Sequence, residues 1–201
     1  MNAVVALDSL IRDRHVWRGQ PTALPPSMQP TGWPALDAVV PTHGWPEAAL
    51  TEILIPADGV GELRLVLPTL ARLTQHGERV VIVAPPYIPY APAWQAAGVD
   101  WRHVSIIDAA PGERAWTLEQ VLHSGSCAAV LGWLSDADDR TLRRLQVAAD
   151  TGRALGFLFR NRAALGNPSP AALRIQVAPG VLQVLKCRGG NPPAPIAFPA
   201  S

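Results

Sequence analysis

Short apolar runs alternate with amphipathic stretches over most of the chain. The apolar runs are residues 50–55, 79–85, 104–109, 127–134 and 154–161. The stretches between them carry apolar side chains at helical spacing, at residues 63–73, 91–99, 114–125 and 136–152. Short apolar runs separated by helices are typical of strands that are buried on both faces. The pattern therefore predicts an α/β fold with a mostly parallel sheet covered by helices.

The two ends of the chain follow other patterns. Residues 172–190 alternate apolar and polar side chains around Pro179-Gly180, which predicts a C-terminal antiparallel hairpin appended to the sheet. Residues 1–18 have apolar positions at helical spacing and precede a proline-rich stretch that reads as a linker. The proline-rich C-terminus is expected to be mobile or extended. The predicted parts are an N-terminal helix with its linker, one core domain and a tail, at residues 1–30, 31–190 and 191–201.

Composition narrows the class of protein. The chain has 201 residues, of which 48% are hydrophobic and 16% charged, enough to bury one core. No apolar run reaches the length of a membrane span, and the N-terminus lacks the apolar region of a signal peptide. We therefore expect a cytoplasmic protein that does not engage membranes. Cys127 and Cys187 lie far apart and predict neither a zinc site nor a disulfide framework.

Charge is distributed unevenly along the chain. Residues 1–152 contain all 16 carboxylates and 11 of the 17 cations, for a net charge of −5. The six cations from Arg153 onward face no carboxylate in that segment, for a net charge of +6. This asymmetry favours an acidic partner such as nucleic acid or an acidic protein surface. The alternative is a basic edge that faces the acidic remainder of the same domain.

The loop between the first predicted strand and the next helix has the glycines of a phosphate-binding loop. Gly59 and Gly61 could let backbone N–H groups surround a phosphate, but Glu62 and Leu63 stand where a lysine and a Ser or Thr are needed. A carboxylate about 4 Å from a phosphate costs roughly 4 kcal/mol at an effective dielectric near 20. We expect no nucleotide cofactor here. In the following helix, Pro68 predicts a kink or an early end.

Other catalytic groups are also missing from the sequence. The second predicted strand ends in Pro85 and Pro86, and a proline side chain cannot accept a proton from an attacking water. The strand at 127–134 carries Gly132 and Trp133 where an aspartate would hold magnesium. The five histidines show no metal-ligand spacing. The sequence predicts no catalytic residue and no metal site.

Several segments, in order, resemble one branch of the RecA-like proteins. "TGWPALDAVVPTHGWPEAALTEIL" is similar to the segment that leads into the RecA phosphate loop. "GVGELRLVLPTLARL", "VAPPYIPYAPAWQAAGVD" and "LEQVLHSGSCAAVLGW" resemble the ImuA family in particular. The resemblance covers nearly all of the chain from Thr31 onward. It implies a RecA-like fold with degenerate ATPase motifs.

The resemblance also implies a function and partners. ImuA-type proteins are accessory factors of SOS-induced translesion DNA synthesis and mutagenesis. The implied partners are an ImuB-like, polymerase-related protein, an error-prone replicative-type polymerase and RecA. One alternative is a SulA-type SOS inhibitor of cell division that binds FtsZ. A second alternative, an active RecA-type ATPase, lacks the phosphate-loop lysine.

Two groups of residues are candidates for binding. The segment "RNRAALGNPSPAALRIQV" is similar in position to the second DNA-binding loop of RecA, and we expect weak, salt-sensitive DNA binding. The candidates for DNA or partner contact are Arg160, Asn161, Arg162, Asn167, Lys186 and Arg188. Rigid aromatic side chains in a proline-rich loop and an apolar stripe near the N-terminus predict a protein interface. The alternative for the aromatic loop is that it packs across the degenerate nucleotide site. These interface candidates are Leu7, Leu10, Ile11, Tyr87, Ile88, Tyr90 and Trp94.

Overall fold

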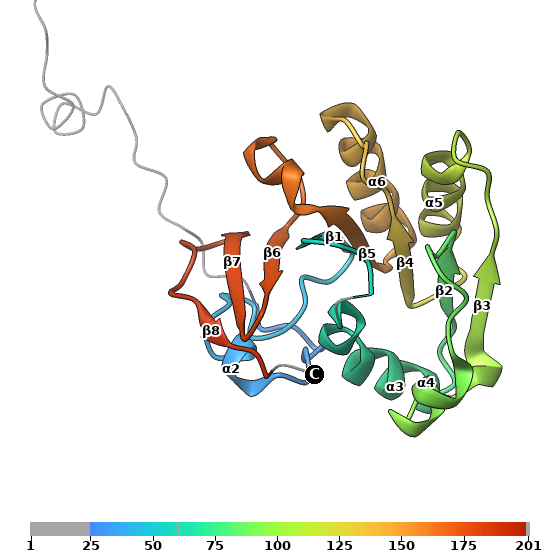
Figure 1. Ribbon diagram of the computed structural model, residues 1–201, viewed down its shortest axis with the longest axis horizontal. Helices are drawn as coiled ribbons and strands as arrows, with labels where there is room; N and C mark the ends of the chain where they lie inside the picture. The colour runs from blue at the N-terminus through green and yellow to red at the C-terminus, as the bar shows by residue number, and fades with distance from the viewer. Residues whose placement is uncertain (1–24, 60, 200–201) are drawn as a thin grey trace, which may run out of the picture.

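A computed structural model describes residues 25–59 and 61–199, which form one eight-stranded sheet with helices on both faces (Figure 1). The strand order is β3-β2-β4-β5-β1-β6-β7-β8. The strands are β1 (Ala49–Ile55), β2 (Val80–Val83), β3 (Val104–Ile107), β4 (Ala129–Trp133), β5 (Leu155–Asn161), β6 (Leu173–Ala178), β7 (Val181–Cys187) and β8 (Ile196–Ala197). The first six run parallel to their neighbours, and β7 and β8 are antiparallel. The predicted α/β class with a C-terminal antiparallel hairpin is confirmed.

The helices divide between the two faces of the sheet. They are α2 (Pro34–Asp37), α3 (Leu67–Gln75), α4 (Ala91–Ala96), α5 (Arg114–His123) and α6 (Asp139–Gly152), with 3-10 turns η1 (Glu62–Leu65), η2 (Trp101–His103) and η3 (Arg162–Gly166). Leu70 of α3 and Trp94 of α4 belong to the core on one face. Leu118 of α5 and Leu142 of α6 belong to the core on the other. The central strands are buried on both faces, as their continuous apolar sequences require.

The helix expected after the glycine loop is divided in two. A 3-10 turn, η1, comes first, and α3 starts at Leu67 with Pro68 in its first turn. Proline is tolerated there because the first N–H groups of a helix have no partner within the helix. The break predicted at Pro68 therefore appears as a change of helix type upstream of the proline.

Both proline-rich ends contribute to the folded domain where the structure describes them. Trp45 donates its backbone N–H to the carbonyl of Gln29 at 2.8 Å, and the Gln29 side chain accepts from Arg72 at 2.7 Å. Residues 25–30, expected to be linker, therefore pack on the core. At the other end β8 pairs with β7, and Figure 1 shows β8 beside α2. Phe198 is buried against Trp33, so the domain extends past residue 190.

The predicted N-terminal helix lies outside the described residues. No helix among residues 25–59 and 61–199 has the length and apolar character that crossing a membrane requires.

Candidate functional site

The loops that follow β1, β2, β4 and β5 meet at the carboxyl edge of the sheet. In open α/β sheets this edge is where ligands bind. Two cavities open there, of about 390 and 340 Å³. Pro86, Trp133 and Thr141 help to line the larger cavity, and Tyr87 and Asn161 the smaller. The structure thus brings together the glycine loop, the Pro85-Pro86 loop and the end of β4.

The glycine loop contains the chain's own carboxylate. Gly59 and Gly61 have φ angles of 79° and 87°, a left-handed conformation that glycine adopts without strain. The Gly59 N–H donates to Oε1 of Glu62 at 3.0 Å. Glu62 is 3% exposed, and its Oε2 is buried without a hydrogen-bond partner among the described residues. The Glu62 carboxylate therefore accepts the hydrogen bond that a phosphate loop would donate to its ligand. Its negative charge would also repel an incoming phosphate.

Packing accounts for the glycine at the end of β4. A Cβ atom on Gly132 would lie 2.3 Å from Cδ2 of Leu118, closer than real side chains approach. An aspartate at this position would therefore require the Leu118 side chain to shift. The next residue, Trp133, stacks on Phe159 with ring centroids 4.8 Å apart. Both positions serve packing in this structure.

A buried ion cluster joins the three central strands. Oε1 of Glu52 on β1 accepts from Arg160 of β5 at 2.6 Å, and Oε2 accepts from Arg174 of β6 at 2.8 Å. Glu52 is 0% exposed, Arg160 1% and Arg174 7%. One carboxylate thus bridges two guanidinium groups in the interior. We refer to Glu52, Arg160 and Arg174 as the buried triad.

The buried triad also holds two loops at the carboxyl edge. Arg160 donates to the carbonyl of Ala137 at 2.7 Å, in the loop between β4 and α6. Arg174 donates to the carbonyls of Ala164 and Leu165 in η3. Buried carbonyls need such donors, so the guanidinium groups fix the loops relative to the sheet.

This placement corrects the expectation for Arg160. Its side chain was expected to contact DNA, but it is buried and its donors serve Glu52 and loop carbonyls. The sequence contained a signal for the triad, because Glu52, Arg160 and Arg174 are charged residues within otherwise apolar strand patterns. Charges in buried strands need partners of opposite sign.

The other candidates for DNA or partner contact differ in exposure. Arg162, Asn167 and Arg188 are exposed. Asn161 is exposed as well, but its side chain accepts from the Ala163 N–H at 2.8 Å and begins η3. Lys186 is half-buried and donates to the carbonyl of Ser169 at 2.6 Å. Arg162, Asn167 and Arg188 therefore remain available for contact.

Lys186 is also electrostatically coupled to its neighbours. Burial is the main cause that lowers the pKa of its ammonium group, and the charges of Arg188 and Arg174 lower that pKa further. Glu52 acts in the opposite direction. The basic C-terminal segment is thus directed partly inward, toward the buried triad.

The aromatic loop after β2 is largely on the surface. Tyr87 is 68% exposed, Ile88 93% and Tyr90 69%. Trp94 differs, because it is only 5% exposed and packs edge-on against Trp101 at a centroid distance of 5.6 Å. The expectation that Trp94 forms part of a protein interface is therefore wrong. Its position on the inner face of α4 places it in the core.

Leu7, Leu10 and Ile11 lie outside the described residues.

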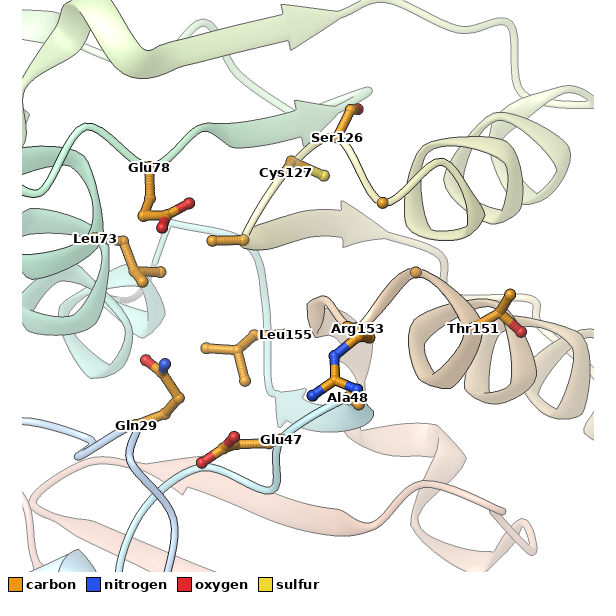
Figure 2. A pocket seen from close by; sticks show the side chains of 13 residues that line it. Gln29, Glu47, Ala48, Leu73, Glu78, Ser126, Cys127, Thr151, Arg153 and Leu155 are labelled. Carbon is orange, nitrogen blue, oxygen red and sulfur yellow. The ribbon is translucent and has the colours of Figure 1, made fainter.

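A larger cavity of about 510 Å³ lies at the opposite edge, where β4 and β5 begin (Figure 2). Figure 2 shows Glu47, Cys127 and Arg153 among the side chains around it. Burial raises the pKa of the Cys127 thiol to about 11, so it is protonated and unreactive at neutral pH. Within the described part of the chain, no group of three His, Cys, Asp or Glu could hold a metal ion. We assign no chemistry to this cavity.

Among the comparisons with known proteins, the one with solved structures found a match. No family model matches the chain, and no curated protein matches it. Among solved structures, it is similar to SulA from Pseudomonas aeruginosa, with a TM-score of 0.48 and 22% sequence identity. The match covers 58% of this chain and 99% of SulA.

Proposed function

We propose that this chain is a non-catalytic accessory protein of SOS-induced translesion DNA synthesis. It acts by binding other proteins of an error-prone polymerase complex. Its partners in this proposal are an ImuB-like, polymerase-related protein and an error-prone replicative-type polymerase, with RecA as a further partner. The partner identities rest on the resemblance of the sequence to the ImuA family.

The observation that carries the non-catalytic part is the Glu62 carboxylate in the glycine loop. It accepts from the Gly59 N–H, so a phosphate would have to displace it and then remain beside it. The repulsion of roughly 4 kcal/mol is about half of the 8 kcal/mol that a micromolar site supplies in total. The end of β4 adds a second reason, because Gly132 and Trp133 stand where an aspartate would hold magnesium.

The binding part of the proposal rests on the exposed loop. Tyr87, Ile88 and Tyr90 are exposed in the loop between β2 and α4, and Tyr87 lines the smaller cavity at the carboxyl edge. Large apolar side chains that are exposed together on a proline-stiffened loop are typical of protein contacts, because they lose little conformational entropy on docking. The loop therefore offers a docking site in place of a catalytic one.

Calorimetry tests the non-catalytic part. Titration of the full chain with Mg-ATP should give no binding in the micromolar range, and Glu62→Gln is a control that removes only the negative charge. Micromolar, magnesium-dependent binding by the unmodified chain would contradict the proposal.

Pull-down with the candidate partners tests the binding part. Tyr87→Ala and Tyr90→Ala should each weaken polymerase-complex binding by at least about 5-fold if they act as interface anchors. Met28→Ala is a matched control, because Met28 is 81% exposed and lies in the segment before α2. Binding to FtsZ without binding to the polymerase proteins would favour the SulA-type alternative.

A further inference from the structure

The loops at one edge of the sheet carry charges of a single sign. Because β1 to β5 run parallel to their neighbours, the loops after β1, β2, β3 and β4 all lie at the carboxyl edge. These loops are residues 56–61, 84–90, 108–113 and 134–138. They contain no Lys, Arg or His, and their five carboxylates belong to Asp58, Asp108, Glu113, Asp136 and Asp138. The surface that these loops form is therefore acidic.

Strand order places the aromatic loop in the middle of this acidic edge. β2 lies between β3 and β4, as Figure 1 shows. An acidic loop follows each of these two neighbours, whereas the loop after β2 has no charge. The exposed side chains of Tyr87, Ile88 and Tyr90 thus lie between two acidic loops in the order of the sheet. An apolar centre with a polar rim is the usual anatomy of a protein interface.

Two cavities extend this face into the surface of the domain. The cavities of about 390 and 340 Å³ share Asp58 and Ser135 in their lining. Pro86 lines the larger cavity and Tyr87 the smaller, so the aromatic loop borders both. Asp136 also lines the larger one. We refer to the two cavities together as the carboxyl-edge groove. An apolar side chain inserted there would have carboxylates beside it.

The carboxylates of the carboxyl-edge groove are available to a partner. Asp58 and Asp136 are exposed, and no ion pair or side-chain hydrogen bond holds either of them among the described residues. The cations are set back from the surface. Arg114, which lines the larger cavity, is half-buried, and Arg160 and Arg174 are buried with their donors directed at Glu52 and loop carbonyls. The charge that a partner meets at the groove is therefore negative.

We propose that this face binds a basic segment of a partner protein. An apolar side chain of that segment docks against Tyr87, Ile88 and Tyr90, and its Lys or Arg side chains lie opposite Asp58 and Asp136. The inference rests on the proposed function, because it names the chemistry of the partner surface that the same loop binds. Complementary charges accelerate the encounter and exclude acidic partners. Nucleic acid does not fit this face, because the carboxylates would repel its phosphates.

Association kinetics with the polymerase-complex partners test the charge. Asp58→Asn combined with Asp136→Asn removes two negative charges from the groove and keeps the size of both side chains. This double variant of the full chain should associate roughly 3- to 10-fold more slowly at low salt, because rim charges act mainly on the association rate. Its association rate should also depend less on salt concentration.

A second double variant is the matched control for net charge. Glu78→Gln combined with Asp150→Asn removes the same two charges at the opposite edge of the sheet, where Glu78 precedes β2 and Asp150 lies near the end of α6. Both side chains are exposed. The control should associate like the unmodified chain. Asp138 is left unchanged in both variants, because its carboxylate accepts from the Thr141 N–H at 2.8 Å and caps α6.

Two synthetic peptides test the face without the polymerase proteins. Both carry the same leucine anchors, which are flanked by lysines in one peptide and by glutamates in the other. The full chain should bind the lysine peptide at least about 10-fold more tightly than the glutamate peptide, because like charges at an interface are strongly unfavourable. Tyr87→Ala and the Asp58→Asn, Asp136→Asn variant should each weaken binding of the lysine peptide.

The two experiments distinguish this inference from the proposed function. If the polymerase proteins do not bind but the lysine peptide binds as expected, the proposed function fails and the inference stands. If the polymerase proteins bind and the groove variant associates like its control, the inference is overturned and the proposed function stands. Equal binding of the two peptides would also overturn the inference. So would DNA binding that Tyr87→Ala weakens, because it would assign this face to nucleic acid.

Discussion

Removing the negative charge of the buried triad should strongly destabilise the fold. Glu52→Gln keeps the size of the side chain but leaves two guanidinium groups, of Arg160 and Arg174, without a counter-charge. The Glu52 carboxylate is 0% exposed and lies 2.6 and 2.8 Å from their nitrogen atoms. Water could solvate the two guanidinium groups in place of the carboxylate only if the sheet opened.

The expected cost follows from the burial. Removing one partner of a buried ion pair costs about 3–5 kcal/mol, because an uncompensated charge remains in the interior. Domains of this size have a total stability of about 5–15 kcal/mol, so the variant should lose a large share of it. With a urea m-value near 2 kcal/mol/M, the unfolding midpoint should fall by roughly 1.5–2.5 M.

Urea unfolding followed by tryptophan fluorescence and circular dichroism measures this shift. Asp139→Asn is the matched control, because Asp139 pairs with Arg143 on the surface of α6, where the two side chains are 40% and 71% exposed. Such a pair contributes only about 0.3–0.5 kcal/mol. A Glu52→Gln unfolding midpoint within about 0.5 M of that of the unmodified chain would refute the reasoning. At an m-value near 2 kcal/mol/M, such a shift would mean a loss of only about 1 kcal/mol in the free energy of unfolding.

Three further predictions follow from individual residues. Arg162→Ala should flatten the slope of log DNA affinity against log salt by about 0.7, which corresponds to the loss of one phosphate contact. Arg160→Ala should leave that slope unchanged and lower the urea unfolding midpoint. An equal change of slope for both variants would contradict the burial of Arg160. The pKa of the Cys127 thiol is raised to about 11, so about 0.1% of it should be thiolate at pH 8. It should therefore react with a disulfide reagent far more slowly in the folded chain than in the unfolded chain. Equal reaction rates in the two states would contradict this. Phe198→Ala should lower stability by about 3 kcal/mol, measured by urea unfolding, because the ring packs against Trp33; an unchanged midpoint would show that the C-terminal segment is dispensable.

Local patterns in the sequence determined most of the architecture. Apolar runs that alternate with amphipathic stretches were sufficient to predict the parallel strands and their covering helices, because burial on both faces requires apolar side chains at every position. Pro179-Gly180 marked the turn of the hairpin for a similarly local reason. The positive φ angles of Gly59 and Gly61 agree with a tight turn between a strand and a helix.

Only the tertiary structure decided which side chains are available for binding. Arg160 lies near the end of an apolar strand and could be read as a surface cation. Its partner Glu52 lies 108 residues earlier and is brought beside it by parallel pairing of β1 and β5. Trp94 and Phe198 were likewise ambiguous, because an aromatic residue near prolines suits either a surface or a core. Burial and ion pairing depend on contacts between segments distant in sequence. Strand order determines those contacts, and a local pattern does not contain it.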